Sequence, residues 1–332
     1  MTVTDAKKTG SRGVLTSLGR SLRELSVLPG LVVLAVVGAI VSPIFFQPPN
    51  VSLIFQQSSE LGVVVVGLVF IVLTGRIDIS LESTVGFAPM VAALLMVSHG
   101  GWGVHASAPV GILITLGIGA LIGLVNGVLV VKVGLDSFIV SLAMLILLRG
   151  VTTGISQGQT LSGLPDAYNF LGSASVAGVP VDVMVTIVLF VLAGLFLKFH
   201  SWGRALYAIG GNESTARAAG VPVDRVLITA FVAASTLAAL AGILLAGRLS
   251  AVTADAGQNL IFSALASTVI GGIALIGGQG RIIGAALGVA LLGVLTNVLT
   301  LAGVSTFWID AVYGVVILLA LLVGRFAGVR RT

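Results

Sequence analysis

The chain has 332 residues, of which 57% are hydrophobic and only 9% are charged, with 17 Lys and Arg residues against 12 Asp and Glu residues. A soluble globular domain carries about 25% charged residues, so this composition excludes a water-soluble protein and indicates a polytopic membrane protein. The lack of cysteine excludes disulfides, thiolate metal sites and cysteine nucleophiles.

Long apolar stretches, separated by charged, polar or Gly-Pro clusters, predict about ten transmembrane helices and an all-α fold. The second stretch has only about 14 residues and cannot cross a hydrocarbon core of about 30 Å unless it is tilted, broken or re-entrant. Whether the second and eighth helices are broken or re-entrant stays open. In chain order the predicted helices cover residues 28–46, 61–74, 83–98, 108–131, 137–154, 179–198, 226–246, 260–276, 282–301 and 305–324.

The polar segments are too short to form a separate soluble domain. We predict an amino-terminal tail at residues 1–27, a membrane domain at 28–324 that includes a large loop at 199–225, and a carboxyl-terminal tail at 325–332. No lysine follows the phosphate-binding pattern G-x-x-x-x-G-K-[ST], so the chain lacks a P-loop for ATP hydrolysis.

Positive charge predicts the orientation, because Lys and Arg concentrate on the cytoplasmic side of membrane proteins. If the amino terminus is cytoplasmic and ten helices alternate, then all but two of the 17 basic residues lie on that side. The exceptions are Arg149 and Arg248. The acidic residues predicted to lie outside are Glu60, Asp166, Asp182, Asp255 and Asp310.

Glycine is abundant, with 44 residues, and two runs keep the small-x-x-x-small spacing that lets membrane helices approach closely. The alternative is that glycines at this density match the spacing by chance. A weak internal sequence similarity between the fourth and ninth stretches, which are predicted to run in opposite directions, also suggests an inverted repeat. The two glycine runs are Gly119, Gly123 and Gly127, and Gly280, Gly284 and Gly288.

The loop at 203–222 carries the signals of a short helix over residues 213–219. Asn212 is a suitable N-cap, Glu213 and Arg217 have i,i+4 spacing, Gly220 suits the end of a helix, and Pro222 blocks its continuation. Such a helix is either a simple connection or a docking surface for a cytosolic partner, since loops on a rigid scaffold often carry binding.

The same loop resembles the cytoplasmic coupling loop of ribose-type permease subunits of bacterial ATP-binding-cassette (ABC) sugar importers, in the branched-chain amino acid and monosaccharide permease superfamily. That pattern is G-R-x-x-Y-A-I-G-G-N-x-x-A-A-R-x-x-G-[IV]. Blocks similar to the family's also occur at residues 74–80, 123–127, 138–150 and 269–284. The resemblance implies that ten residues of the loop, including the non-matching Glu213, couple transport to an ATPase: Gly203, Arg204, Tyr207, Gly210, Gly211, Asn212, Glu213, Ala216, Arg217 and Gly220.

Some positions depart from the family pattern and leave the particular solute open. Arg76 replaces a glycine of the block T-G-G-I-D-L-S, Glu82 stands where glycine is usual, and Ile261 replaces an acidic residue. Amino acids and signalling sugars remain possible solutes.

Ionisable residues inside a membrane are functional candidates by default. Arg149 either extends to the interface or contacts an outer acidic residue or a binding protein, and Asp78 is explained by a local salt bridge with Arg76 or by capping. No chain of buried carboxylates suited to proton or sodium coupling is evident, and His99, His105 and His200 lack metal spacing. The residues that we propose for a translocation path are Asn126, Asn297, Ser141 and Asp78.

The resemblance implies a permease subunit in the bacterial inner membrane, with both termini cytoplasmic, that imports a monosaccharide or related small polar solute. Its implied partners are a cytosolic ATP-binding subunit, an extracytoplasmic solute-binding protein, a second permease copy or a homologous permease, and membrane lipid. We expect no catalytic residue, cofactor, metal or nucleic acid. A stand-alone secondary transporter or facilitator is the alternative.

Overall fold

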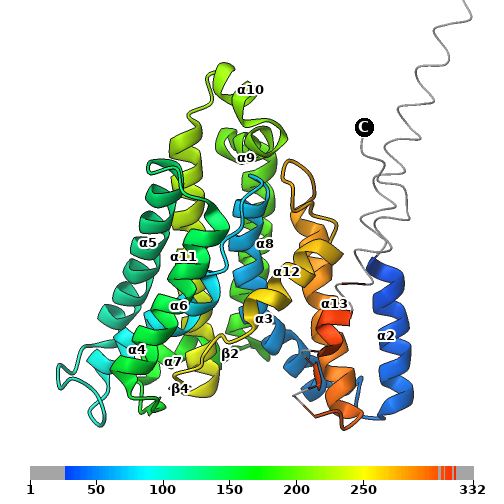
Figure 1. Ribbon diagram of the computed structural model, residues 1–332. Helices are drawn as coiled ribbons and strands as arrows, with labels where there is room; N and C mark the ends of the chain where they lie inside the picture. The colour runs from blue at the N-terminus through cyan, green and yellow to red at the C-terminus, as the bar shows by residue number, and fades with distance from the viewer. Residues whose placement is uncertain (1–26, 306–307, 310, 316–317, 319–332) are drawn as a thin grey trace, which may run out of the picture.

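The structure, a computed structural model, describes residues 27–305, 308–309, 311–315 and 318 of the chain. Its regular structure in these residues is almost entirely helical, as predicted (Figure 1). The helices are α2 (Val27–Val41), α3 (Pro48–Val72), α4 (Leu81–Met96), α5 (Ala108–Val131), α6 (Ser137–Ser156), α7 (Asp166–Ser173), α8 (Val181–Phe199), α9 (Ser201–Gly211), α10 (Glu213–Ala218), α11 (Val223–Leu249), α12 (Leu260–Ile270) and α13 (Ile282–Leu301). Two short antiparallel strand pairs join β1 (Leu161–Ser162) to β4 (Ala251–Val252) and β2 (Ser175–Val176) to β3 (Val179–Pro180).

Within the part of the chain that the structure describes, six helices are long and apolar enough to cross a membrane, namely α3, α5, α6, α8, α11 and α13. Three further apolar helices, α2, α4 and α12, are shorter. Residues 308–309, 311–315 and 318 are helical as well. The rest of the expected helix at 305–324, and the tails except for residue 27, lie outside the described residues, so the number of ten helices stays a prediction.

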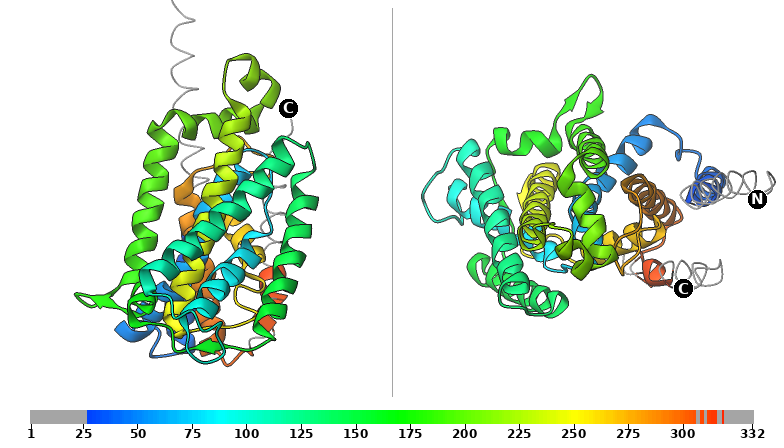
Figure 2. Two further views of the ribbon diagram at one scale, coloured as in Figure 1. Left: turned by 90° about the vertical axis from the view of Figure 1, so that its left-hand side faces the viewer. Right: turned by 90° about the horizontal axis from the view of Figure 1, so that it is seen from above.

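The centre of the bundle is α11, which packs against α3, α4, α5 and α7. Gly119, Gly123 and Gly127 of α5 face it, and the two helices run in opposite directions (Figure 2). A Cβ atom on Gly119 would lie only 2.6 Å from the carbonyl oxygen of Ser235, and one on Gly127 would lie 3.1 Å from the Cα of Ile228. The first glycine run is therefore a contact face that brings two backbones together.

The second glycine run joins α13 to α12. Added Cβ atoms on Gly284 and Gly288 would collide with the carbonyl oxygens of Gly271 and Ser267. Gly280 lies before α13 and has a φ of 121°, a conformation that only glycine adopts readily. Two of the three predicted positions thus form a helix contact, and the third forms a turn.

The short helices leave two loops inside the bundle. α12 has 11 residues and a length of about 16 Å, roughly half of a hydrocarbon core, and it ends at Ile270 rather than at the predicted residue 276 because Gly271 and Gly272 follow. The loop at 73–80 between α3 and α4 is equally internal, and its residues Asp78 and Ser80 are wholly buried. Irregular backbone is tolerated at membrane depth only where protein or water surrounds it.

The start of α3 differs from the prediction of a short helix at 61–74. Its 25 residues begin at Pro48, and the polar run up to Glu60, which reads as a loop, lies inside the helix. The hydroxyls of Ser58 and Ser59 donate to carbonyls of their own helix at 2.7 and 2.8 Å, so these polar groups are satisfied without water. α2 ends at Val41, before the predicted residue 46.

The two ends of the bundle differ in charge. We call the end with α9 and α10, at the top of Figure 1, the α10 end, and the opposite end the α7 end. Among the described residues, Arg149 and Arg248 are the basic residues placed toward the α7 end. The basic residues at the α10 end are Arg76, Lys132, Lys198, Arg204, Arg217, Arg225 and Arg281.

Candidate functional site

The loop between α8 and α11 contains the short helix that the capping pattern predicts. α10 (Glu213–Ala218) ends one residue before the predicted 219. The side chain of Asn212 accepts a hydrogen bond from the backbone N–H of Thr215 at 2.9 Å, as an N-cap does. Gly220 follows with a φ of 82°, which favours glycine.

A second helix, α9, precedes it and was not predicted. Its last residues are Gly210 and Gly211, a pair that reads as a helix stop in a sequence. α9 turns back from the end of α8, where a Cβ atom on Gly203 would lie 2.7 Å from the Cα of Leu197. The guanidinium of Arg204 donates to the carbonyl of Phe199 at 2.7 Å and fixes this turn.

A chain of ion pairs ties α10 to the neighbouring loops. Glu213 accepts from Arg76 at 2.9 Å and from Arg217 at 3.2 Å, so the predicted i,i+4 pair forms. Asp224 pairs with Arg217 at 2.9 Å and with Lys132 at 2.8 Å. The hydrogen bond from Arg76 holds the pKa of the Glu213 carboxyl below its ordinary value. Exposed pairs are worth at most about 1 kcal/mol each, but together these four fix the position of α10.

The carboxyl-terminal end of α9 contacts the two internal loops through glycine backbone. An added Cβ on Gly210 would collide with the carbonyl oxygen of Leu73 and the backbone nitrogen of Gly278. The N–H of Gly278 in turn donates to the carbonyl of Leu73 at 2.8 Å. The residues of this contact, which we call the glycine junction, are Gly75, Gly210, Gly211, Gly277 and Gly278.

The rest of the loop divides into anchored and exposed residues. The hydroxyl of Tyr207 donates to the carbonyl of Gly280 at 3.0 Å, and Ala216 is buried. The tip of the loop is exposed on α10 and its flanks. The exposed residues at the tip are Gly211, Asn212, Ser214, Thr215, Arg217, Ala218, Ala219 and Gly220.

Asp78 lies with Ser80 and Asn126 in the interior, and all three are wholly buried. Asp78 accepts hydrogen bonds from the N–H and hydroxyl of Ser80 at 2.9 and 2.6 Å, and the amide of Asn126 donates to the Ser80 hydroxyl at 2.8 Å. The explanation by a salt bridge with Arg76 is wrong, because Arg76 pairs with Glu213. The local capping interaction is the one that forms.

The remaining two path candidates form their hydrogen bonds outside this cluster. Asn297 exchanges two hydrogen bonds with Asn50, at 3.0 and 2.8 Å, and so joins α13 to the start of α3. The hydroxyl of Ser141 donates to the carbonyl of Phe138 in its own helix at 3.1 Å. Of the four candidates, Asp78 and Asn126 are the two that a hydrogen bond joins directly, at 3.3 Å.

Arg149 contacts an acidic residue, as one of the three explanations for it proposed, but its partner Glu82 is not among the acidic residues predicted to lie outside. Its guanidinium donates to Glu82 at 2.7 Å and to the backbone carbonyl of Asp255 at 3.3 Å. The pair borders a cavity of about 560 Å³ that Thr153 and Gln258 also line. Sequence reasoning missed Glu82, which lies 67 positions away from its partner.

The expectation of a membrane domain without buried carboxylates is wrong. Glu60, Asp78, Glu82 and Asp182 are each at most 5% exposed. Arg248 donates to Glu60 at 2.6 Å, in the same way that an arginine pairs with Glu82. Buried charges of this kind require partners, and the partner here lies 188 positions away in the sequence. Among the described residues no three metal-ligating side chains gather in one place.

Comparison with known proteins places these features in a family. The family model of the branched-chain amino acid transport system, permease component, matches residues 50–321. The chain belongs to this permease family. It is 37% identical over 306 residues to the ribose import permease protein RbsC of Escherichia coli strain K12, covering 91% of this chain and 94% of that protein.

Two further relatives of this permease show the same extent of similarity. The ribose import permease protein RbsC of Bacillus subtilis is 35% identical over 324 residues, 97% of each chain. The autoinducer 2 import system permease protein LsrC of Enterobacter sp. strain 638 is 35% identical over 298 residues, 89% of this chain and 84% of that protein. No solved structure shows a significant match. The similarity covers nearly the whole chain and includes the α9–α10 loop and both internal loops.

Proposed function

We propose that this permease is the membrane-spanning subunit of an ABC importer that moves a monosaccharide or a related small polar solute into the cytoplasm. The observation that carries the proposal is the α9–α10 loop. Its capped tip is exposed, while its base rests on the two internal loops through the glycine junction. A force applied to α10 therefore reaches the interrupted helices directly, because backbone contacts without side chains have little freedom to yield.

The cytosolic ATP-binding subunit docks on the exposed tip, and closure of the ATPase pair moves α9 against the loops at 73–80 and 271–281. The chain supplies no phosphate-binding lysine motif, so the partner supplies the energy. The concentration of Lys and Arg at the α10 end supports a cytoplasmic position for this end and for both termini.

An extracytoplasmic solute-binding protein delivers the solute at the α7 end. The solute path forms between this chain and a second permease copy or a homologous permease, along the cavity beside Arg149 and Glu82. Asp78, Asn126, Ser141 and Asn297 stay path candidates, with Asp78 and Asn126 favoured by their proximity. The cavity is lined by guanidinium, amide, hydroxyl and carboxyl side chains, which offer both donors and acceptors to a neutral, hydroxyl-rich solute.

The names of the relatives agree with this solute class, since two are ribose permeases and one imports autoinducer 2. We further propose ten transmembrane helices with an inverted repeat in the bacterial inner membrane. Support for the repeat comes from α5 and α13, which run in opposite directions and each pack a face of glycines against another helix, α5 against α11 and α13 against α12.

A stand-alone secondary transporter is the second candidate, because buried carboxylates are the groups with which such proteins bind protons or sodium. The partners of three of the four buried carboxylates speak against it. Glu60 and Glu82 are each held by an arginine, and Asp78 is held by Ser80 and Asn126. The fourth, Asp182, accepts from the backbone N–H of Val183 at 2.8 Å and forms no ion pair among the described residues.

The test is reconstitution in liposomes with radiolabelled ribose and a panel of other monosaccharides. We expect uptake only when the ATPase encoded with this permease, the binding protein and ATP are all present. The permease alone should show neither ATP hydrolysis nor accumulation under a proton or sodium gradient. Accumulation by the permease alone would refute the proposal and favour the secondary transporter.

A further inference from the structure

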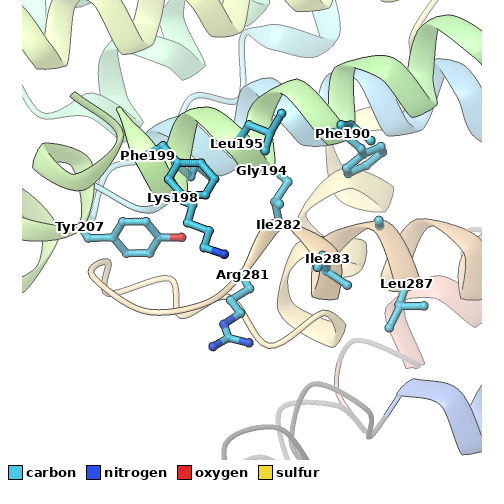
Figure 3. A pocket seen from close by; sticks show the side chains of 13 residues that line it. Phe190, Gly194, Leu195, Lys198, Phe199, Tyr207, Arg281, Ile282, Ile283 and Leu287 are labelled. Carbon is cyan, nitrogen blue, oxygen red and sulfur yellow. The ribbon is translucent and has the colours of Figure 1, made fainter. Parts of the chain in front are cut away.

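A groove on the outer surface of the bundle, between α8 and α13, has no role in the proposed transport cycle. Its volume is about 770 Å³. Leu195, Phe199 and Ile283 on its walls are about half exposed or more, so the groove opens sideways onto the surrounding lipid rather than into the bundle. In Figure 3 Gly194 of α8 lies opposite Ile282, and because glycine has no side chain it leaves space between the two helices.

The walls change character along the membrane normal. Toward the membrane centre they consist of apolar side chains such as Phe190, Val191 and Leu287. At the α10 end the groove meets Lys198 in the last turn of α8, Arg281 directly before α13 and Tyr207 of α9. Eight residues of helix separate Phe190 from Lys198, a distance of about 12 Å. The polar groups therefore lie at headgroup depth when the apolar walls lie at acyl-chain depth.

The two basic residues border the mouth of the groove from different elements. In Figure 3 the ammonium of Lys198 and the hydroxyl of Tyr207 point toward the backbone of Arg281, whose guanidinium extends away from them. Both basic residues are exposed, and the ammonium of Lys198 lies 5.0 Å from the ring centroid of Phe199. Lys198 takes part in none of the ion pairs formed among the described residues. A site with positive charge above an apolar slot matches an anionic amphiphile, and basic pockets between membrane helices on the cytoplasmic side bind anionic headgroups.

We propose that this groove binds one anionic phospholipid of the cytoplasmic leaflet, with its phosphate at Lys198 and Arg281, beside Tyr207, and an acyl chain along the apolar wall past Gly194. The proposal rests on the cytoplasmic position of the α10 end. It does not depend on the solute or on the ATPase. Because Tyr207 also holds the carbonyl of Gly280 beside the glycine junction, the lipid phosphate lies next to the loop that α9 contacts.

Native mass spectrometry of the purified permease tests the site, with phosphatidylglycerol and phosphatidylcholine of identical acyl chains as probes. We expect one phosphatidylglycerol to be retained at least tenfold more tightly than phosphatidylcholine. Lys198→Gln should weaken its retention roughly fivefold, as expected for one basic residue at the surface of an anionic membrane. Arg225→Gln removes an equally exposed charge at the same end of the bundle but outside the groove, and should leave retention unchanged.

A second variant fills the groove with a larger side chain and does not alter its charge. Gly194→Leu should abolish tight retention; the Cγ2 methyl of Ile282 lies 3.3 Å from the added Cβ and has to move slightly to admit the residue. Gly117→Leu is the matched control on α5, where an added Cβ meets nothing within 4 Å. If Gly194→Leu does not fold, Lys198→Gln still decides the result.

Three outcomes would overturn the proposal. Equal retention of the two lipids, or equal effects of Lys198→Gln and Arg225→Gln, would show that lipid contacts the groove without specific binding. Displacement of phosphatidylglycerol by glycerol 3-phosphate at millimolar concentration would assign the mouth to a free phosphate. Retention by the monomer but not by a dimer would assign the groove to the interface between permease copies.

Discussion

Replacing Gly210 with alanine adds one carbon atom to the glycine junction and so tests whether this contact transmits force. The added Cβ would collide with backbone atoms of Leu73 and Gly278, and would also lie 3.0 Å from the carbonyl carbon of Gly277. Backbone cannot rotate away as a side chain can, so α9 must lift from the internal loops. Overpacking of this kind costs about 1–3 kcal/mol of unfolding free energy. The adjacent Gly211→Ala is the matched control, because its Cβ meets nothing within 4 Å.

The control should raise the unfolding free energy by about 0.5–1 kcal/mol, since alanine is the better helix former. The measurements are thermal unfolding in detergent and ATP-driven uptake by the reconstituted importer, at equal amounts of permease. We expect Gly210→Ala to lower the melting temperature and to uncouple ATP hydrolysis from uptake, and Gly211→Ala to retain both. If Gly210→Ala transports normally, or if the two variants behave alike, the glycine junction does not transmit force.

Four further predictions concern the loop, the buried ion pairs and the topology. Ala216→Pro places proline inside α10, at a cost of about 3 kcal/mol or more, and should abolish co-purification of the ATPase while membrane insertion stays normal. Full uptake by this variant would reduce the loop to a connection. Arg149→Met should lower the unfolding free energy by about 3–5 kcal/mol, because Glu82 stays buried without a partner. Adding Glu82→Gln to this variant should restore much of the lost stability. If the double variant is no more stable than Arg149→Met, the pairing is contradicted. The lowered pKa of Glu213 means that its contact with Arg76 stabilises the protein above the ordinary glutamate pKa of about 4.3, and that this contribution is lost as the pH falls through the lowered value. Glu213→Gln should remove this part of the pH dependence of thermal unfolding, and an unchanged profile would refute the assignment. A single cysteine at the exposed Ser173 should react with an impermeant maleimide from outside intact cells, whereas labelling from inside only would reverse the topology.

The sequence was most informative where structure depends on neighbouring residues. The bounds of α5 and α13 agree with the prediction, because both helices are uniformly apolar between clear stops. α10 was predicted for a similar reason, since Asn212 and Gly220 act within one or two turns of the helix that they delimit. The family was also indicated by the loop pattern, and the comparisons confirm it.

Features that depend on distant residues escaped prediction. Glu60 reads as part of a polar loop because its partner, Arg248, belongs to a helix that comes much later in the chain. α9 escaped for a related reason, since Gly210 looks like a helix stop until the loop that it contacts is known. Membrane burial reverses the usual interpretation of both residue types: a charge is accepted inside when it is paired, and a glycine is accepted in a helix when another backbone lies against it.

The glycine junction also bears on how the protein is made. A ribosome releases residues in order, so Gly75 enters the membrane about two hundred residues before Gly277 and Gly278 are synthesised. Until then the carbonyl of Leu73 lacks the N–H of Gly278, its partner in the finished fold. Unsatisfied backbone at membrane depth costs several kcal/mol per group, so the loop at 73–80 has to be shielded by water or by an insertion factor in the meantime. A chain that stops before Gly278 therefore leaves this carbonyl without its partner in the finished fold.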